Sequence, residues 1–365
     1  MKSAMKRPGR TTCSSSSRGL AATLALVLGG ALGPWAATVA DETVTADPPS
    51  GAAALATPSV SYLGREDVRE WIRETSEARG LDRHRVAGLF ARLERREDIL
   101  SKIATPAERT LTWREYRPIF LGEERAADGR AFLDRHAETF ARARARFGVP
   151  AETIAAIIGV ETFYGRYRGK DAVLESLVTL AFDYPPRAAF FASELAEFLV
   201  LADAEGWNPL EIRGSYAGAM GLAQFISSSY RAYAIDFDED GKVDLFDSPA
   251  DAIGSVANYL VRHGWQADEP VARRWEPAAD AQDAARALVR ERLAPAIAPA
   301  TVAALGFEDA DAAGEERLSV MTFAGSGGEE FWVGYTNFYA ITRYNHSRLY
   351  ALAVHQLAEA LAAGS

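Results

Sequence analysis

Apolar residues recur every three or four positions from Ser59 onward, which is the spacing of one face of an α-helix. Two such runs precede residue 148, with apolar members Val68, Trp71 and Ile72, then Val86, Leu89, Phe90 and Leu93. Most of the remaining chain keeps this spacing, and the strand-like, turn-rich stretch lies around residues 235–245. The pattern predicts a mostly α fold, and no internal repeat is evident in the sequence.

Composition and charge limit the class of protein and of partner. With 365 residues, 48% of them hydrophobic, the chain has enough apolar surface for one or two packed domains. The formal net charge is −10, and five cations but no acid precede residue 41, so residues 41–365 carry −15. Such a surface repels nucleic-acid phosphates, and we therefore expect no nucleic-acid partner.

Residues 1–40 have the features of a secretory signal: a basic, serine-rich start and an uncharged apolar run from Gly19 to Ala40. We expect cleavage after Ala40 and export of the mature chain. The alternative is an uncleaved anchor helix, although Pro34 and several glycines interrupt the run. The one cysteine, Cys13, precedes the apolar run, so the sequence has no lipoprotein cysteine motif.

Several kinds of chemistry are excluded by residue type. The mature chain has no cysteine, and its five histidines are too scattered for a typical zinc site. No HExxH motif, no GxSxG motif and no phosphate-binding loop occurs. We expect no organic cofactor, and any catalysis should rely on carboxylates.

Glu161 is the carboxylate with the most suggestive surroundings. Pro150 and Gly165 mark the predicted ends of a helix, and Glu161 shares its apolar stripe with Ile154, Ile157 and Ile158. A carboxyl group that is partly removed from water should have a raised pKa, as a general acid requires. The alternative is a structural glutamate paired with Arg166 or Arg168.

Five ordered motifs carry a family resemblance that extends from about Ser59 to the C-terminus. They are GVETFYG (159–165), FDYPPR (182–187), GSYAGAMGLAQF (214–225), DAIGSVANY (251–259) and NFYAITRYN (337–345). With these motifs the chain resembles the membrane-bound lytic murein transglycosylase B family. The resemblance implies a lysozyme-like catalytic core with an additional helical domain, cleavage of peptidoglycan, and Glu161 as the sole catalytic acid and base.

The resemblance also implies a set of substrate-binding residues. Ser215 and Gln224 would bind N-acetyl and ring substituents, and Arg187 would meet lactyl or peptide carboxylates. The family usually has a second cation where this chain has Pro186. The residues expected to face the cleft are Tyr259, Asn337, Tyr344 and Asn345. For the small residues between Ser215 and Gln224, close packing is the alternative explanation.

An acidic loop spans residues 236–251. Asp236, Asp238 and Asp240 occupy positions 1, 3 and 5 of an EF-hand pattern, glycine follows, and Lys242 supplies the position-7 carbonyl. Position 12 is Asp247 instead of the usual glutamate, so the closing ligand is expected to be Asp251, as in the resembled family. We predict a structural Ca²⁺ site within a small β or EF-hand-like unit; the alternative is a solvated acidic turn.

The resemblance implies a lytic transglycosylase that acts in cell-wall turnover. It would cleave the β-1,4 bond between N-acetylmuramic acid and N-acetylglucosamine and leave 1,6-anhydromuramoyl ends. Two rivals remain: a hydrolytic muramidase with Asp183 or Glu175 as second acid, and a non-catalytic, calcium-dependent peptidoglycan-binding protein. We expect a periplasmic monomer, soluble or loosely membrane-associated, with glycan strands and wall-synthesis proteins as candidate partners.

These patterns divide the chain into a signal peptide (1–40), a flexible linker (41–58), an N-terminal helical part (59–147), a catalytic core with the calcium loop (148–270), a helical segment (271–320) and a C-terminal part that completes the cleft (321–365).

Overall fold

The computed structural model describes residues 61–104, 111–313 and 317–364, so the predicted signal peptide and linker lie outside the described residues. The described chain is mostly helical, as the sequence predicted, and contains two small antiparallel sheets. None of the helices in these ranges has the length and apolar character needed to cross a membrane.

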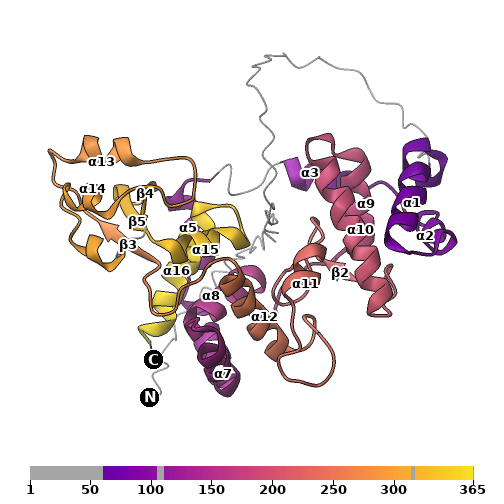
Figure 1. Ribbon diagram of the computed structural model, residues 1–365, viewed down its shortest axis with the longest axis horizontal. Helices are drawn as coiled ribbons and strands as arrows, with labels where there is room; N and C mark the ends of the chain where they lie inside the picture. Colours follow the sequence, from indigo (N-terminus) through magenta and orange to yellow (C-terminus); the bar gives the residue numbers. More distant parts are fainter. Residues whose placement is uncertain (1–60, 105–110, 314–316, 365) are drawn as a thin grey trace, which may run out of the picture.

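The predicted N-terminal helical part does not pack as one unit. Its first helices lie beside α9 and α10 at one end of the molecule, whereas its later helices pack on α8, α12 and α16 (Figure 1). The first group is η1 (Tyr62–Gly64), α1 (Glu66–Arg79), α2 (Arg83–Phe90) and α3 (Glu97–Ala104), and the second is α5 (Trp113–Phe120), α6 (Glu123–Arg135) and α7 (Ala137–Phe147).

The centre of the molecule is built around a buried helix, α8 (Ala151–Thr162). It packs against α6, α7, α12 (Pro249–Arg262) and α16 (Arg348–Ala362). Almost every α8 residue is buried, because the sequence is apolar on all sides of the helix. Pro150 caps its start as the sequence predicted, and the helix ends at Thr162, three residues before Gly165.

The other elements of the core include the helix pair α9–α10 and the short elements around it. They are β1 (Asp171–Ala172), α9 (Val173–Asp183), η2 (Pro185–Arg187), α10 (Ala188–Ala204), β2 (Arg213–Gly214), α11 (Ser227–Tyr233) and α15 (Thr336–Tyr344). The short strands β1 and β2 pair antiparallel, and this pairing places the start of α9 beside the loop that follows Gly214.

A three-stranded antiparallel sheet lies at the opposite end of the molecule from α1 and α2 (Figure 1). Its order is β3 (Ala272–Trp275), β5 (Gly328–Gly334) and β4 (Ser319–Gly325). The short helices α13 (Gln282–Leu288), α14 (Pro299–Ala303) and η3 (Glu308–Ala313) accompany it. The unit has its own apolar core, which includes Trp275, Val302, Phe331 and Val333.

The observed secondary structure corrects two predictions. Residues 235–245 form turns and not strands, and the segment predicted as helical, 271–320, begins with a strand and ends inside another. The boundary predicted at 320/321 therefore falls within β4. Gly325 pairs with Gly328 across a two-residue turn, Ser326-Gly327. A short turn that contains glycine is typical of a β-hairpin, but helical spacing in the rest of the chain led to the helix prediction.

Candidate active site

Glu161 lies in the last turn of α8 and meets a tyrosine from α16. The Tyr350 hydroxyl donates to Glu161 Oε1 at 2.7 Å. Tyr350 is completely buried, and its burial, reinforced by the charge of Glu161, raises its pKa well above the ordinary value. The phenol therefore keeps its proton and acts as a fixed donor to the carboxyl group.

Tyr344, at the end of α15, extends this aromatic environment. Its ring lies parallel to that of Tyr350, with centroids 6.4 Å apart, and 4.8 Å from the ring centroid of Tyr259. Burial and the charge of Glu161 also raise the pKa of Tyr344. The hydroxyls of Tyr344 and Tyr259 donate to the carbonyls of Ala223 and Arg343, each at 2.5 Å. Both residues thus belong to one buried cluster, in which Tyr344 lies near Glu161, and their predicted place in the cleft stays a prediction.

The backbone after Glu161 has an unusual, closely supported shape. Phe163 and Tyr164 both have left-handed φ angles, of +51° and +56°. The guanidiniums of Arg125 and Arg166 each lie 4.3 Å from the Phe163 ring centroid. Arg125 also donates to the Gly159 carbonyl at 2.5 Å. These contacts hold the end of α8, and with it Glu161, in one position.

A glycine inside α8 makes this shape possible. A Cβ atom at Gly159 would lie 2.6 Å from the Tyr164 ring, so a larger residue would displace that tyrosine. The second glycine of the GVETFYG motif, Gly165, has a φ of +92°. The motif is therefore explained by backbone geometry on both sides of the glutamate.

Ser215 and Gln224 lie in the small-residue loop after β2, and both are buried. Ser215 Oγ accepts from the backbone N–H groups of Ala217 and Ala219 at 3.3 and 3.0 Å. Gln224 Nε2 donates to the carbonyl of Gly221 at 2.8 Å, and the residue has a φ of +49°. These predicted sugar contacts thus also hold the loop in shape.

The small residues of this loop serve close packing, the alternative that the sequence left open. Ala217 and Ala219 are buried, and a Cβ atom at Gly221 would lie 2.3 Å from the Leu245 carbonyl oxygen. A Cβ atom at Gly218 would lie 2.7 Å from Leu177. The loop is therefore packed tightly against α9 and the acidic loop.

Three carboxylates of the acidic loop converge. Oxygens of Asp236, Asp238 and Asp251 lie within 4.8 Å of one another. Calcium ligands 2.3–2.6 Å from an ion lie at most about 5 Å apart, so the spacing suits Ca²⁺. Burial raises the pKa of Asp251, whose carboxylate accepts from the backbone N–H groups of Phe237 and Asp244.

Two further residues of the acidic loop are placed differently. Asp240 Oδ1 accepts from the backbone N–H of Lys242, and Asp240 is not in the converging group. Asp247, at position 12, forms an ion pair with Arg168 at 3.1 Å. The structure thus brings Asp251, and not Asp247, to the first acids of the loop.

Comparison with known proteins decides the family. The sequence profile described as Transglycosylase SLT domain matches residues 64–359. The chain belongs to this transglycosylase family. The membrane-bound lytic murein transglycosylase B of Escherichia coli (strain K12) is 35% identical in an alignment of 319 positions that covers 82% of this chain and 84% of that protein. The resemblance inferred from the five motifs is confirmed.

Solved structures of this transglycosylase family share the fold. Soluble lytic transglycosylase SltB1 from Pseudomonas aeruginosa is 46% identical, with a TM-score of 0.75, over 82% of this chain and 99% of that chain. Escherichia coli Slt35 in complex with calcium is 35% identical, with a TM-score of 0.74, over 84% and 96%. SltB3 from Pseudomonas aeruginosa in complex with NAG-anhNAM-pentapeptide is 30% identical, with a TM-score of 0.68, over 81% and 79%.

The transglycosylase places Asn337 and Asn345 differently from each other. Asn337 is completely buried, and its Nδ2 donates to the carbonyls of Gln266 and Glu269, each at 2.8 Å. Its Oδ1 accepts from the Gln266 N–H, so the amide holds this loop and does not face a cleft as predicted. Asn345 is also buried, and its Nδ2 has no hydrogen-bond partner among the described residues.

Arg187 precedes α10 and is half-buried. Its guanidinium lies 4.2 Å from the Phe190 ring centroid and 5.2 Å from that of Phe191, and burial lowers its pKa. The structure therefore presents Arg187 on an aromatic support at the start of α10, and its contact with a substrate carboxylate stays a prediction.

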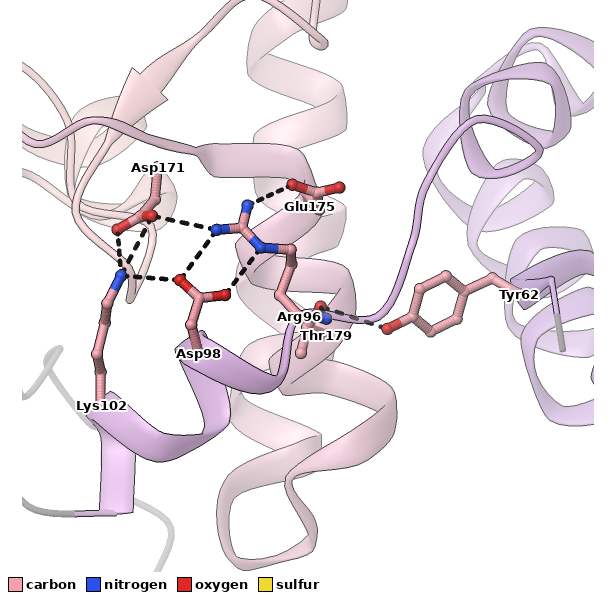
Figure 2. Close-up of polar contacts among 7 residues, drawn as sticks. All are labelled: Tyr62, Arg96, Asp98, Lys102, Asp171, Glu175 and Thr179. Carbon is pink, nitrogen blue, oxygen red and sulfur yellow. Dashed lines mark hydrogen bonds and ion pairs between the residues drawn. The ribbon is translucent and has the colours of Figure 1, made fainter. Parts of the chain in front are cut away.

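The two carboxylates considered as second acids are both engaged in ion pairs. Figure 2 shows Glu175 facing Arg96 from α9, with Nη1 to Oε2 at 2.7 Å. Asp183 accepts from Arg65 Nη1 and from the Tyr62 hydroxyl, each at 2.7 Å. Both carboxylates join the first N-terminal helices to α9, and these ion pairs give each of them a structural role.

Tyr350 and Arg125 are the site residues that sequence reasoning missed. Tyr350 lies in the aromatic-rich stretch near the C-terminus, but nothing in its spacing separates it from core tyrosines. Arg125 lies in α6, and burial lowers its pKa to about 10. Its contact with α8 depends on the packing of α6 against α8.

Proposed function

We propose that this chain is a lytic murein transglycosylase. It cleaves the β-1,4 bond between N-acetylmuramic acid and N-acetylglucosamine and leaves a 1,6-anhydromuramoyl end. The observation that carries the proposal is the buried hydrogen bond from Tyr350 to Glu161, within the stretch that matches the transglycosylase family. A known homologue of this fold, SltB3, has been solved with an anhydromuramoyl ligand.

The geometry suggests how one carboxyl group performs both proton transfers. Because the Tyr350 hydroxyl donates to Oε1, the acid proton of Glu161 belongs on Oε2. Glu161 gives this proton to the glycosidic oxygen, and the bond from that oxygen to C1 of the muramoyl residue breaks. The muramoyl N-acetyl group stabilises the positive charge that develops at C1.

The second step returns the enzyme to its starting state. Glu161, now a carboxylate, takes the proton from the C6 hydroxyl of the same muramoyl residue. The C6 oxygen then bonds to C1, and no water is consumed. The buried aromatic cluster of Tyr259, Tyr344 and Phe225 suits a step from which water must be excluded.

A hydrolytic muramidase is the rival reaction, and it needs a second carboxylate to activate water. Glu175 and Asp183 were the two candidates, and both are held by arginines. The single-carboxyl mechanism therefore accounts better for the arrangement.

Paired variants test the role of Glu161. We expect Glu161→Gln to lower the release of muropeptides from purified sacculi by about 10³-fold, since general acid and base catalysis is removed. Glutamine still accepts the Tyr350 hydrogen bond, so thermal melting should confirm a folded protein. Glu175→Gln is the matched control and should retain activity. Equal losses in both variants would favour a two-carboxylate hydrolase, and a folded wild-type chain that releases nothing would favour the binding protein.

We further propose a structural Ca²⁺ held by Asp236, Asp238 and Asp251, with Asp240 and the Lys242 carbonyl completing the loop. The converging carboxylates and the calcium complex of Slt35 support it. The ion would hold the acidic loop against α12 and supply no step of the reaction.

Isothermal titration with Ca²⁺ and melting in EDTA test this site. We expect saturable binding and a rise in melting temperature with Ca²⁺. Asp251→Asn should abolish both, whereas Asp247→Asn, outside the cluster, should retain them. Equal behaviour of the two variants would contradict the assignment.

We propose a periplasmic location for the mature chain, on the basis of its N-terminal signal features. Peptidoglycan strands are its substrate, and wall-synthesis proteins remain candidate partners of a monomer. Fractionation of cells that express the full chain, with N-terminal sequencing of the product, tests cleavage after Ala40. A product that retains residues 1–40 in the membrane fraction would support the anchor instead.

A further inference from the structure

A cavity of about 580 Å³ lies between the start of α5, the end of β4 and the start of α16. Its size is within the range of small-molecule binding sites. Residues that line it include Thr112, Trp113, Glu291, Phe323, Ser347 and Arg348. Nothing in the proposed mechanism uses this cavity.

Aromatic and hydroxyl groups give the cavity a mixed surface. The rings of Trp113 and Phe323 are in contact, with centroids 5.9 Å apart, and the Arg348 guanidinium lies 6.0 Å from the Phe323 ring centroid. The Thr112 and Ser347 hydroxyls belong to the starts of α5 and α16. Such a surface accepts the apolar stems and the polar groups of a peptide or a sugar.

The charges around the cavity select an anion. Arg348 is exposed and forms no ion pair within the part of the chain that the structure describes. Arg290 and Arg292 border a neighbouring hollow that shares Arg348 with the cavity. Glu291 is the one acid that lines either. Three arginines against one acid stand out on a chain whose residues 41–365 carry −15.

The cavity and the active site share two helices. Arg348 precedes Tyr350 by two residues on α16, and Trp113 precedes Tyr116 on α5 by three. The two helices pack against each other, which places this part of α5 near the donor to Glu161. The cavity and the donor to Glu161 are therefore built on the same pair of packed helices.

We propose that this cavity is a subsite for the carboxylate-bearing stem peptide of the peptidoglycan strand, with Arg348 as its main contact. The assignment rests on the proposed function, because it takes its ligand from that substrate. A neutral sugar offers no charge to pair with the arginines, whereas peptide carboxylates accept from guanidinium groups in pairs. The subsite would favour strands that retain their peptides.

Binding to the Glu161→Gln protein tests the proposal without turnover. The three ligands are a muramoyl tetrasaccharide with stem peptides, the same glycan after an amidase has removed the peptides, and chitotetraose, which has no carboxylate. Adding Arg348→Ala should weaken binding of the peptide-bearing ligand about tenfold and leave the other two unchanged. Arg92→Ala, an exposed arginine in the N-terminal part, is the matched control and should change none.

Each other outcome contradicts the assignment. Equal weakening for both muramoyl ligands would show that Arg348 does not recognise the stem peptide, because the lactyl group is an amide in one ligand and a free carboxylate in the other. Weakening for all three would indicate a plain glycan subsite. No change would leave the cavity without this role. Arg348→Lys, which keeps the charge but not the paired donors, should show an intermediate loss. Because binding is measured without catalysis, these results stand even if wild-type products prove not to be anhydromuropeptides.

Discussion

Carboxylates in two regions of this molecule meet opposite kinds of neighbours. In the first region, between α3 and α9, Asp98 and Glu175 face Arg96, and Asp171 faces Lys102 (Figure 2). In the second region, between α8 and α16, Glu161 accepts from a buried tyrosine. The two regions are built from similar helices, but one is cross-linked by ion pairs and the other is lined by phenols.

The difference shows how the surroundings of a carboxyl group decide whether it serves as a structural ion-pair partner or as a catalytic acid. Hydrogen bonding to Arg96 lowers the pKa of Asp98 to about 2, so this carboxylate stays charged and serves as a link. In the second region burial dominates: it raises the pKa of Tyr344 and Tyr350 and lowers the pKa of His355, also on α16, to about 4. Groups there are kept neutral, which is the setting in which a carboxyl group can hold a transferable proton.

The largest effect that would sharpen this contrast is expected from Tyr350→Phe. The variant removes a hydrogen bond worth about 1.5–3 kcal/mol to the carboxylate, which corresponds to about a 10- to 100-fold loss in kcat. The donor favours the charged carboxylate, so its loss should move the alkaline fall of the kcat profile to higher pH. Rates on solubilised glycan strands between pH 4 and 9 measure both effects.

Tyr344→Phe is the matched control, because its hydroxyl donates to the Ala223 carbonyl and not to Glu161. It should lower the melting temperature and leave the shape of the pH profile intact. Identical pH profiles for wild type and Tyr350→Phe would contradict a functional link between Tyr350 and Glu161.

His355 should make the second region sensitive to acid. Its pKa is lowered from 6.5 to about 4 by burial first and by Arg273 second, although Glu359 lies 3.4 Å from its Nε2. The unfolded chain binds the proton more readily, so stability is complete above pH 6.5 and is lost as the pH falls from 6.5 to 4. Between pH 7 and 5 this loss should amount to about 2 kcal/mol.

Urea unfolding at pH 7 and pH 5 measures this dependence. His355→Gln should remove most of it, whereas the same change at the exposed His84 should leave it in place. Equal pH dependence in wild type and His355→Gln would show that burial of this histidine does not control acid stability.

The smallest effect is expected in the first region. Arg96 is about one-third exposed, so the ion pairs that it makes are partly screened by water. Arg96→Ala should cost about 1 kcal/mol of unfolding free energy or less, and the difference should shrink in 0.5 M salt. Activity should be unchanged. A loss of activity at constant stability would show that the network also supports the site.

Local sequence predicted the parts of the site that depend on neighbouring residues. The place of Glu161 near the end of a buried helix follows from its apolar stripe, and the convergence of Asp236 and Asp238 follows from loop spacing. Whether the small residues of the 214–224 loop serve a ligand or close packing could not be decided from the sequence, because small residues suit both a ligand and a neighbouring backbone.

Features set by distant contacts were not predictable in this way. Tyr350 is 189 residues from Glu161 in the chain, and their contact depends on the packing of α8 against α16. The family motif predicted that Asn337 faces the cleft, but its amide Nδ2 donates both of its hydrogen bonds to carbonyls of the 266–269 loop. The β4–β5 hairpin was missed because residues 271–320 were predicted to be helical and 321–365 were predicted only to complete the cleft.

The most direct test of the central claim is the isotopic content of the product formed in ¹⁸O-labelled water. Purified sacculi are digested with residues 41–365, and the released muropeptides are analysed by mass spectrometry. If Glu161 directs the C6 oxygen to C1, the products contain no ¹⁸O and are lighter than reducing muropeptides by one molecule of water. Reducing products that carry ¹⁸O at C1 would show that water is the nucleophile, and the single-carboxyl mechanism would be wrong.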